Sequence, residues 1–307
     1  MAGELAQAAE TYMRSAEAGR KAGATAADMI SSELEAYRIA LYQGHSEQAL
    51  PEIERRLQQL RGWWRQTQQG QSPAEAPDQE LLQRALIGAL DVARAAHQRL
   101  ENWQASLDLL QETAELQQAR GDSEQEQART LFNSYSPLLR LGRLDQAQAL
   151  LERCLEVFKQ ADDVIRQART LGSLAEVWNQ RGSRLQAIAL AQQVLAMFEH
   201  FDAPQERAIS HGNLASYLAE AGDYPACAAH RLAEIIYCFV TGHRQDLKRA
   251  LNNHAIHTNQ AAEADADYRL PLLLDLVRQP EFAVLRDFIQ ASGQSIEALQ
   301  AAVDELL

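Results

Sequence analysis

The sequence predicts an all-α protein built from repeated pairs of antiparallel helices, and three observations support this fold class. The five residues 127–131 recur letter for letter at residues 167–171, a spacing of 40. Gly142, Gly182 and Gly222 share that period. Between these glycines, apolar residues recur at the spacing of three and four that is typical of amphipathic helices. A repeat of this length indicates units that bury their apolar faces only against their neighbours.

The unit around Gly182 illustrates the predicted helix pair. An apolar stripe from Leu171 to Trp178 precedes the glycine, and a second stripe from Ala187 to Phe198 follows it. Glycine readily adopts the left-handed conformation that ends a helix. We therefore expect two helices joined by a turn at Gly182.

The residue pattern of this unit resembles the tetratricopeptide repeat (TPR) family. The family's order of large, small, large, glycine, small and small positions is matched by Leu174-Ala175, Trp178, Gly182, Ala187 and Ala191. The usual TPR unit has about 34 residues, so a 40-residue unit implies longer helices, similar to those of kinesin light chains and many bacterial arrays. The resemblance implies a right-handed superhelical solenoid.

The resemblance covers about residues 28–262, which we expect to form the repeat array. An N-terminal capping helix is expected within residues 1–27 and a C-terminal helical cap at residues 263–307, because the ends of a solenoid need a less regular cover. Prolines and a glutamine-rich run interrupt the apolar pattern at residues 66–79, which predicts an exposed loop.

Several local features carry their own expectations. Pro137 lies inside a first helix, so a kink is expected near residues 133–137. Glu101 stands where the better-formed units have glycine. Trp63 and Trp64 are adjacent and cannot share one helical stripe, so they either cover a helix junction, which we favour, or form a ligand platform. The inner side of the helix at residues 244–262 is expected to hold Leu247, Leu251, Ala255 and Thr258.

A polar pattern on the first helices is the strongest functional signal. Residues at one position of the 40-residue period are Asn133, Ser173, Asn213 and Asn253, and four residues earlier stand Arg129, Arg169, Ile209 and Arg249. Residues four apart share a helix face, and this face is turned roughly 200° from the apolar stripe. A plain solvated face is the alternative interpretation.

The TPR resemblance implies that these first helices line a concave groove, where asparagines of kinesin light chain and O-GlcNAc transferase hold the backbone of an extended peptide. A side-chain amide offers both a donor and an acceptor to a peptide bond, and arginines can bind carboxylates. We therefore predict peptide binding by Arg129, Asn133, Arg169, Ser173, Asn213, Arg249 and Asn253, with most of the affinity at Arg169, Asn213, Arg249 and Asn253.

Composition excludes several other classes. The net charge of −13 argues against nucleic-acid binding, which needs a basic footprint. No apolar run approaches the length of a membrane span. Charged residues interrupt residues 1–24, so no secretory signal is expected and the predicted location is cytoplasmic. Cys154, Cys227 and Cys238 lack disulfide or metal spacing, which favours core thiols.

Six of the eight histidines lie between His200 and His257, which raises the question of a metal or acid–base site. His211 and His254 occupy stripe positions, and no third ligand accompanies His254 and His257 at metal spacing. Structural histidines are therefore the favoured interpretation, and we expect neither metal nor cofactor.

The phosphate-binding, hydrolase and metalloprotease motifs are all missing from the sequence, which weakens an enzymatic role. We expect a non-enzymatic scaffold whose partner is a protein or an extended peptide, with an acidic or C-terminal segment favoured. The alternatives are a peptide-responsive regulatory sensor and a recruiting or inhibitory partner of an effector such as a caspase-like protease.

Overall fold

The computed structural model describes residues 10–15, 18, 26–71, 73, 76–198 and 200–307. The chain divides into two compact units, Met1–Val157 and Phe158–Leu307. Most of the expected N-terminal capping helix lies outside the described residues. The described part contains helices and no strands, so the prediction of an all-α repeat fold is confirmed.

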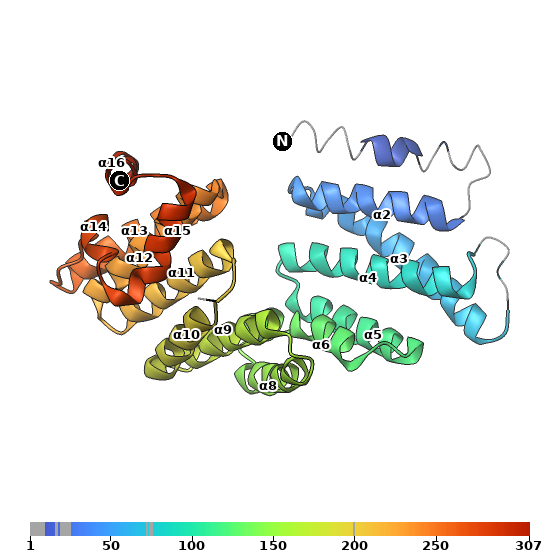
Figure 1. The fold of residues 1–307 in the computed structure, drawn as a ribbon. Helices are drawn as coiled ribbons and strands as arrows, with labels where there is room; N and C mark the ends of the chain where they lie inside the picture. Colours follow the sequence, from blue (N-terminus) through green and yellow to red (C-terminus); the bar gives the residue numbers. More distant parts are fainter. Residues whose placement is uncertain (1–9, 16–17, 19–25, 72, 74–75, 199) are drawn as a thin grey trace. The chain divides into compact units, whose positions relative to one another are not determined.

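The first unit is a series of helices (Figure 1), and one apolar core lies among its residues 30–116. Its helices are α2 (Ala26–Tyr42), α3 (Ser46–Gln68), α4 (Gln79–Arg99), α5 (Trp103–Arg120), α6 (Glu124–Phe132), α7 (Tyr135–Arg140) and α8 (Leu144–Gln160), the last of which begins in this unit. Helix α4 packs against α2, α3 and α5. Side chains such as Ile53, Leu60 and Leu90 are fully buried there. Trp63 and Trp64 are both half-buried against the same core, so they act as a cover.

The second unit continues the helix pairs and ends in shorter helices. Its elements are α9 (Val164–Gln180), α10 (Arg184–Phe198), α11 (Pro204–Glu220), α12 (Tyr224–Thr241), α13 (Arg244–Glu263), α14 (Leu273–Leu276), η1 (Pro280–Phe282), α15 (Ala283–Ser292) and α16 (Ile296–Leu306). Phe282, Leu285 and Val303 of the final segment pack against the apolar side of α12, which contains Ile235 and Ile236. This segment therefore buries an apolar face that the last regular helix pair leaves open.

Polar side chains at the helix starts explain several boundaries. Asp78, Asp163 and Asp223 each accept a hydrogen bond from the backbone N–H three residues later. Ser123 and Glu126 form a reciprocal capping box at the start of α6. These oxygens satisfy N–H groups that have no partner within the helix. None of the described helices is both long enough and apolar enough to cross a membrane.

The turns between paired helices depend on left-handed backbone. Gly182 has φ +79° and Gly222 has φ +83°, as expected for glycines that follow a helix end. Glu101 occupies the corresponding turn before α5 with φ +59°. The degenerate unit thus keeps the turn geometry, although a side chain makes the left-handed conformation less favourable.

The kink expected near residues 133–137 is confirmed. Helix α6 ends at Phe132, Asn133 and Ser134 form a turn, and α7 begins at Tyr135. Pro137 has no N–H to donate to the carbonyl four residues earlier, so the helix cannot continue straight through this point. One first helix is thereby divided into two short ones.

The expected inner side of α13 is correct for Leu247 and Leu251, which are half-buried against the core, and wrong for the second half of the helix. Ala255 and Thr258 are exposed, whereas Ala250, His257 and Ala261 are buried. Two stripes of similar spacing run along this helix, and the sequence interpretation chose the one without histidine. Burial of His257 is possible because its ring nitrogen meets a thiol partner on α12.

Gly172 inside α9 and Gly182 in the turn after it should respond in opposite directions to alanine. Gly182→Ala places a side chain at φ +79° and should lower the free energy of unfolding by about 1 kcal/mol. Gly172 lies inside the helix with no atom near the position of an added Cβ, so Gly172→Ala should raise it by about 0.5–1 kcal/mol. Urea denaturation followed by circular dichroism measures both. If both variants changed the free energy of unfolding in the same direction, the left-handed turn assigned to Gly182 would be contradicted.

Candidate functional site

An exposed stripe on α9 and α11 contains the central residues of the predicted peptide site. Arg169 of α9 is 53% exposed, and its guanidinium lies 2.8 Å from the carboxylate of Glu206 on α11. Ile209, which is 40% exposed, and Asn213, which is exposed, follow Glu206 along the same face of α11. We call Arg169, Ile209 and Asn213 the α9–α11 stripe.

A second polar contact joins the same two helices near their C-terminal ends. Asn179 Nδ2 of α9 donates to Glu220 Oε2 of α11 at 2.9 Å. Together with the Arg169–Glu206 pair, this contact bridges the two helices at two points, one near their starts and one near their ends. The stripe therefore lies on helices and not on a loop.

Two other predicted residues of the second unit are less available. Ser173 is buried, and its hydroxyl donates to the Arg169 carbonyl at 3.1 Å. Asn253 is half-buried on α13, on the flank of the buried stripe that contains Ala250 and His257. Neither residue presents a fully exposed polar group.

Arg249 is exposed on α13. It is 51% exposed and pairs with Asp246 at 3.0 Å on the same helix. Like Arg169, it therefore has an acidic neighbour. Exposed pairs of this kind contribute about 0–1 kcal/mol, so a ligand carboxylate can compete for such an arginine at small cost.

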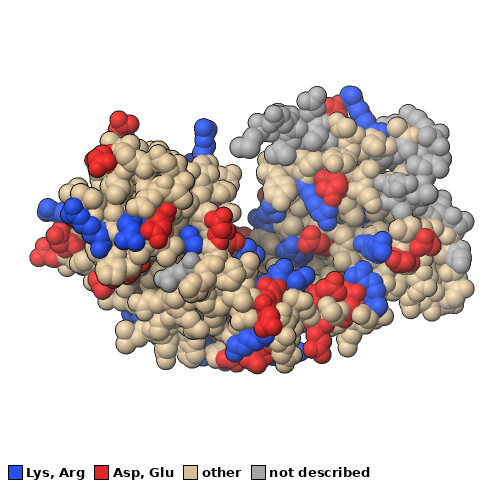
Figure 2. Space-filling model, in the orientation of Figure 1, with Lys and Arg blue, Asp and Glu red and all other residues tan. Residues whose placement is uncertain are grey.

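The first unit carries the other two predicted residues. Arg129 is exposed on α6, and Asn133 is exposed in the turn that follows. Asn133 Nδ2 donates to the Arg129 carbonyl at 3.2 Å. The break before Pro137 thus moves Asn133 from the middle of a helix to its end. Figure 2 shows that acidic and basic side chains are interspersed on the face in view.

A buried ion pair on α12 was not anticipated from the sequence. Arg231 and Glu234 pair with each other and are almost completely buried. Arg231 Nη2 also lies 3.4 Å from the Gly212 carbonyl and 3.3 Å from Ser216 Oγ, both on α11. A charge inside a protein is retained when it is paired and hydrogen-bonded in this way.

Gly212 allows this ion pair to pack against α11. A Cβ at this position would lie 2.5 Å from Glu234 Oε1, closer than atoms can approach. A glycine in the middle of a helical pattern often marks such a close approach, and this signal could have located the site in the sequence. Burial raises the pKa of Glu234, and the nearby Arg231 opposes that rise.

Several histidines of the second unit contact other polar groups inside it. The Nδ1 atoms of His211 and His230 lie 2.9 Å apart, so one ring donates to the other. His257 Nδ1 lies 3.0 Å from Cys227 Sγ. Burial lowers the pKa of both His230 and His257 to about 4. His211 is buried as expected from its stripe position.

His254 and the cysteines complete the set of candidate reactive groups. His254 is half-buried, and its Nδ1 lies 3.0 Å from the Tyr268 hydroxyl. All three cysteines are buried and free, and burial raises the pKa of Cys154 to about 11. Within the described ranges, no group of three or more His, Cys, Asp or Glu residues is arranged to hold a metal ion.

The depressed histidine pKa values predict a loss of stability in mild acid. As pH falls from about 6.5 to about 4, histidines of the unfolded chain bind protons while His230 and His257 stay neutral in the folded chain. Each unit of pKa difference corresponds to about 1.36 kcal/mol, so we expect a loss of a few kcal/mol. The raised pKa of Glu234 acts in the opposite direction.

Urea denaturation at pH about 7 and about 4.5 tests this prediction. It compares the wild type with the double variant His230→Gln/His257→Gln and with the control His243→Gln, which changes an exposed histidine. The double variant should show a smaller pH dependence than the wild type, and the remainder comes from His211 and His254, whose pKa values burial also lowers. The control should behave as the wild type. An unchanged pH dependence in the double variant would contradict the prediction.

Comparison with known proteins identifies the repeat. Residues 138–200, which include parts of α7 to α10, match the model of the tetratricopeptide repeat family. No curated protein matched the sequence.

The solved structure of BtubC (BKLC) from P. vanneervenii is similar over 87% of this chain and 94% of its own, with 13% identity and a TM-score of 0.55. A putative kinesin light chain from Podosopora anserina with nearly identical TPR-like repeats has 16% identity, covers 77% of this chain and 96% of its own, and has a TM-score of 0.47. The similarity to BtubC, over most of both chains, indicates the same fold. The chain is therefore a helical repeat protein with a TPR-like fold and a recognised TPR segment at residues 138–200.

Proposed function

We propose that the chain is a non-enzymatic protein–protein interaction scaffold and that it binds an extended peptide along the α9–α11 stripe. The observation that carries this proposal is the exposed amide of Asn213, which forms no hydrogen bond within the described residues. An amide can donate to one peptide group and accept from another. It therefore recognises an extended backbone without requiring a particular side chain.

The neighbours of Asn213 add two further kinds of contact. Ile209, one helical turn earlier, offers exposed apolar surface on the same face. Arg169 has five N–H donors, and Glu206 is within hydrogen-bond distance of one of its terminal nitrogens. The remaining donors suit a carboxylate of the ligand. We therefore propose a partner segment that has an extended backbone and an acidic side chain or a C-terminal carboxylate.

The candidate reactive groups of the second unit support a binding role. Cys227 and Cys238 are buried, and burial raises the pKa of each thiol to about 12, so both are protonated at neutral pH. His211 and His257 are enclosed in the core. Groups in such positions stabilise a fold and do not meet a substrate.

A peptide-responsive sensor is the second candidate function. Ser216 follows Asn213 by three residues on α11 and lies 3.3 Å from the buried Arg231 of α12. A ligand that displaces the Ser216 side chain would remove one of the hydrogen bonds of the Arg231–Glu234 pair. The sensor proposal thus requires a change in α12 upon binding, whereas a simple scaffold does not.

Replacing Asn213 should weaken binding and leave the fold intact. Loss of the amide removes hydrogen bonds that contribute roughly 0.5–1.5 kcal/mol each, so Asn213→Ala should weaken partner binding about tenfold. Asn252→Ala, at an exposed position of α13, is the control. The measurement is affinity capture from cells of origin with the wild type and both variants, followed by mass spectrometry. It identifies the partner and compares how much of it each of the three proteins recovers.

A partner recovered by the wild type and the control, but depleted in Asn213→Ala, supports the proposal. A synthetic peptide from that partner should then show the same ranking in a binding titration. Equal recovery by all three proteins would exclude the α9–α11 stripe as the binding surface.

A further inference from the structure

A separate groove lies in the first unit, between α6 and α8. Its volume is about 640 Å³, which is in the range of sites that hold ligands or side chains of a partner. Apolar side chains dominate its floor, with Leu131 from α6 and Leu150 and Val157 from α8. Each of these three side chains is half-buried, so part of its apolar surface faces the groove.

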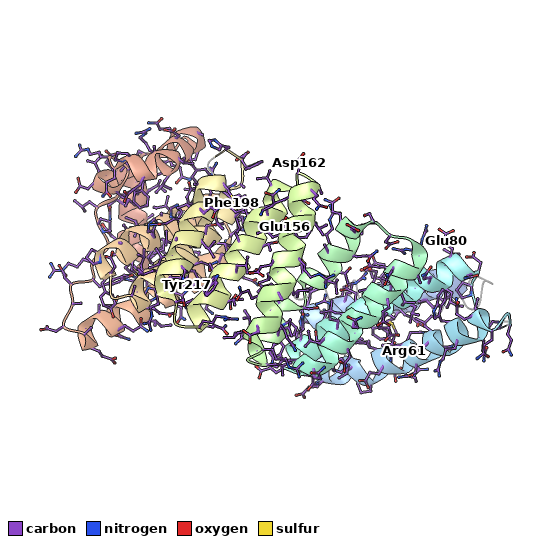
Figure 3. All side chains as sticks on the ribbon, turned by 90° about the horizontal axis from the view of Figure 1, so that it is seen from below. Arg61, Glu80, Glu156, Asp162, Phe198 and Tyr217 are labelled. Carbon is purple, nitrogen blue, oxygen red and sulfur yellow. The ribbon has the colours of Figure 1, made fainter. Side chains whose placement is uncertain are left out.

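The rim of the groove is acidic. Glu124 lies in the first turn of α6, and Glu152 and Glu156 lie on α8, where Figure 3 labels Glu156. Arg153 is the one basic side chain among the lining residues, so the rim carries a net negative charge. Glu152 accepts a hydrogen bond from Gln148 of the same helix at 2.8 Å, which leaves carboxylate lone pairs available to a ligand.

The equivalent helix pair 40 residues later shows that this charge is not required by the repeat. Its apolar positions are kept, since Ala128, Leu131, Leu150 and Val157 correspond to Ala168, Leu171, Leu190 and Met197. Its acidic positions are not kept, since Glu124, Glu152 and Glu156 correspond to Val164, Gln192 and Ala196. A helix pair of this repeat is thus compatible with an uncharged rim, and the carboxylates need a separate explanation.

Cys154, which also lines the groove, does not explain why the rim is acidic. Its thiol lies in the floor of the groove, but its Sγ donates to the Ala128 carbonyl at 3.6 Å, and burial raises its pKa to about 11. A protonated, hydrogen-bonded thiol of this kind is a packing group and not a nucleophile. The features that remain available to a ligand are the apolar floor and the carboxylates of Glu124 and Glu152.

We propose that this groove docks a short amphipathic segment of a partner protein that carries lysine or arginine beside its apolar side chains. The apolar side chains of such a segment would cover the leucines and the valine of the floor. Its cations would meet Glu124 and Glu152, whereas an acidic segment would be repelled. This preference is opposite to that of the arginine-bearing α9–α11 stripe, so the two surfaces select different segments.

The test uses the full chain and three fluorescein-labelled peptides of about 14 residues, long enough to form a helix when bound. The first is a Leu/Lys peptide with one apolar stripe, the second is its Leu/Glu counterpart, and the third is a scrambled Leu/Lys peptide without a stripe. Fluorescence anisotropy is measured near physiological salt, where long-range attraction to the acidic chain is screened. The amphipathic Leu/Lys peptide should bind at least threefold more tightly than either of the others.

The variant Glu124→Gln/Glu152→Gln then locates the binding. It should bind the amphipathic Leu/Lys peptide about threefold to tenfold more weakly than the wild type, as expected for the loss of two exposed ion pairs. The control Glu297→Gln/Glu305→Gln makes the same charge change at exposed positions of α16, one of them also in a first helical turn. This control should retain the wild-type affinity.

A third variant, Leu150→Gln, tests the apolar floor. It should bind the same peptide at least threefold more weakly than the wild type. Circular dichroism establishes that each variant is folded. The proposal is overturned if the scrambled or Leu/Glu peptide binds as tightly as the amphipathic Leu/Lys peptide. It is also overturned if the affinity of either groove variant for this peptide falls less than threefold. The same holds if the affinity of the α16 control falls as much as that of the groove variants.

Discussion

The structure depends on the burial of each helix pair against its neighbours. An amphipathic helix pair has no second apolar layer of its own, so it is stable only when the next pair covers it. This constraint accounts for the 40-residue period, because each helix pair must present its apolar face to the next pair in the same way. It also explains the left-handed turns, which reverse the chain within a few residues and allow the two helices of a pair to pack side by side.

Packing between neighbouring helix pairs leaves some helix faces exposed. On α11, the side chains of Ala208, His211 and Leu214 are buried, whereas Ile209 and Asn213 remain exposed between them. Beneath this helix, Arg231 of the α12 ion pair donates to the Gly212 carbonyl and to the Ser216 hydroxyl. A rigid, fully packed helix with one polar and partly apolar exposed face is suited to binding a flexible segment, because little of the protein must be ordered on association.

The sequence was sufficient for the features that depend on periodicity. Identical letters at residues 127–131 and 167–171 located the repeat, and Pro137 located the break in a first helix. It was insufficient where tertiary partners decide burial. Ser173 shares a repeat position with Asn213, but its short hydroxyl bonds to its own helix and it is buried. His257 was assigned to no stripe because its thiol partner lies 30 residues away. The burial of the Arg231–Glu234 pair could likewise not be predicted, because charged residues in a helix are usually solvated.

The central claim is that partners bind the exposed face of the first helices, and a site-specific photo-crosslinker tests it most directly. The crosslinking residue is placed at Ile209, on the α9–α11 stripe, or at Leu185, which is 82% exposed at the start of the second helix α10. Both positions are accessible, so exposure alone does not decide the result. The account predicts that partner peptides crosslink at Ile209 and not at Leu185. Crosslinks at Leu185 alone would contradict it.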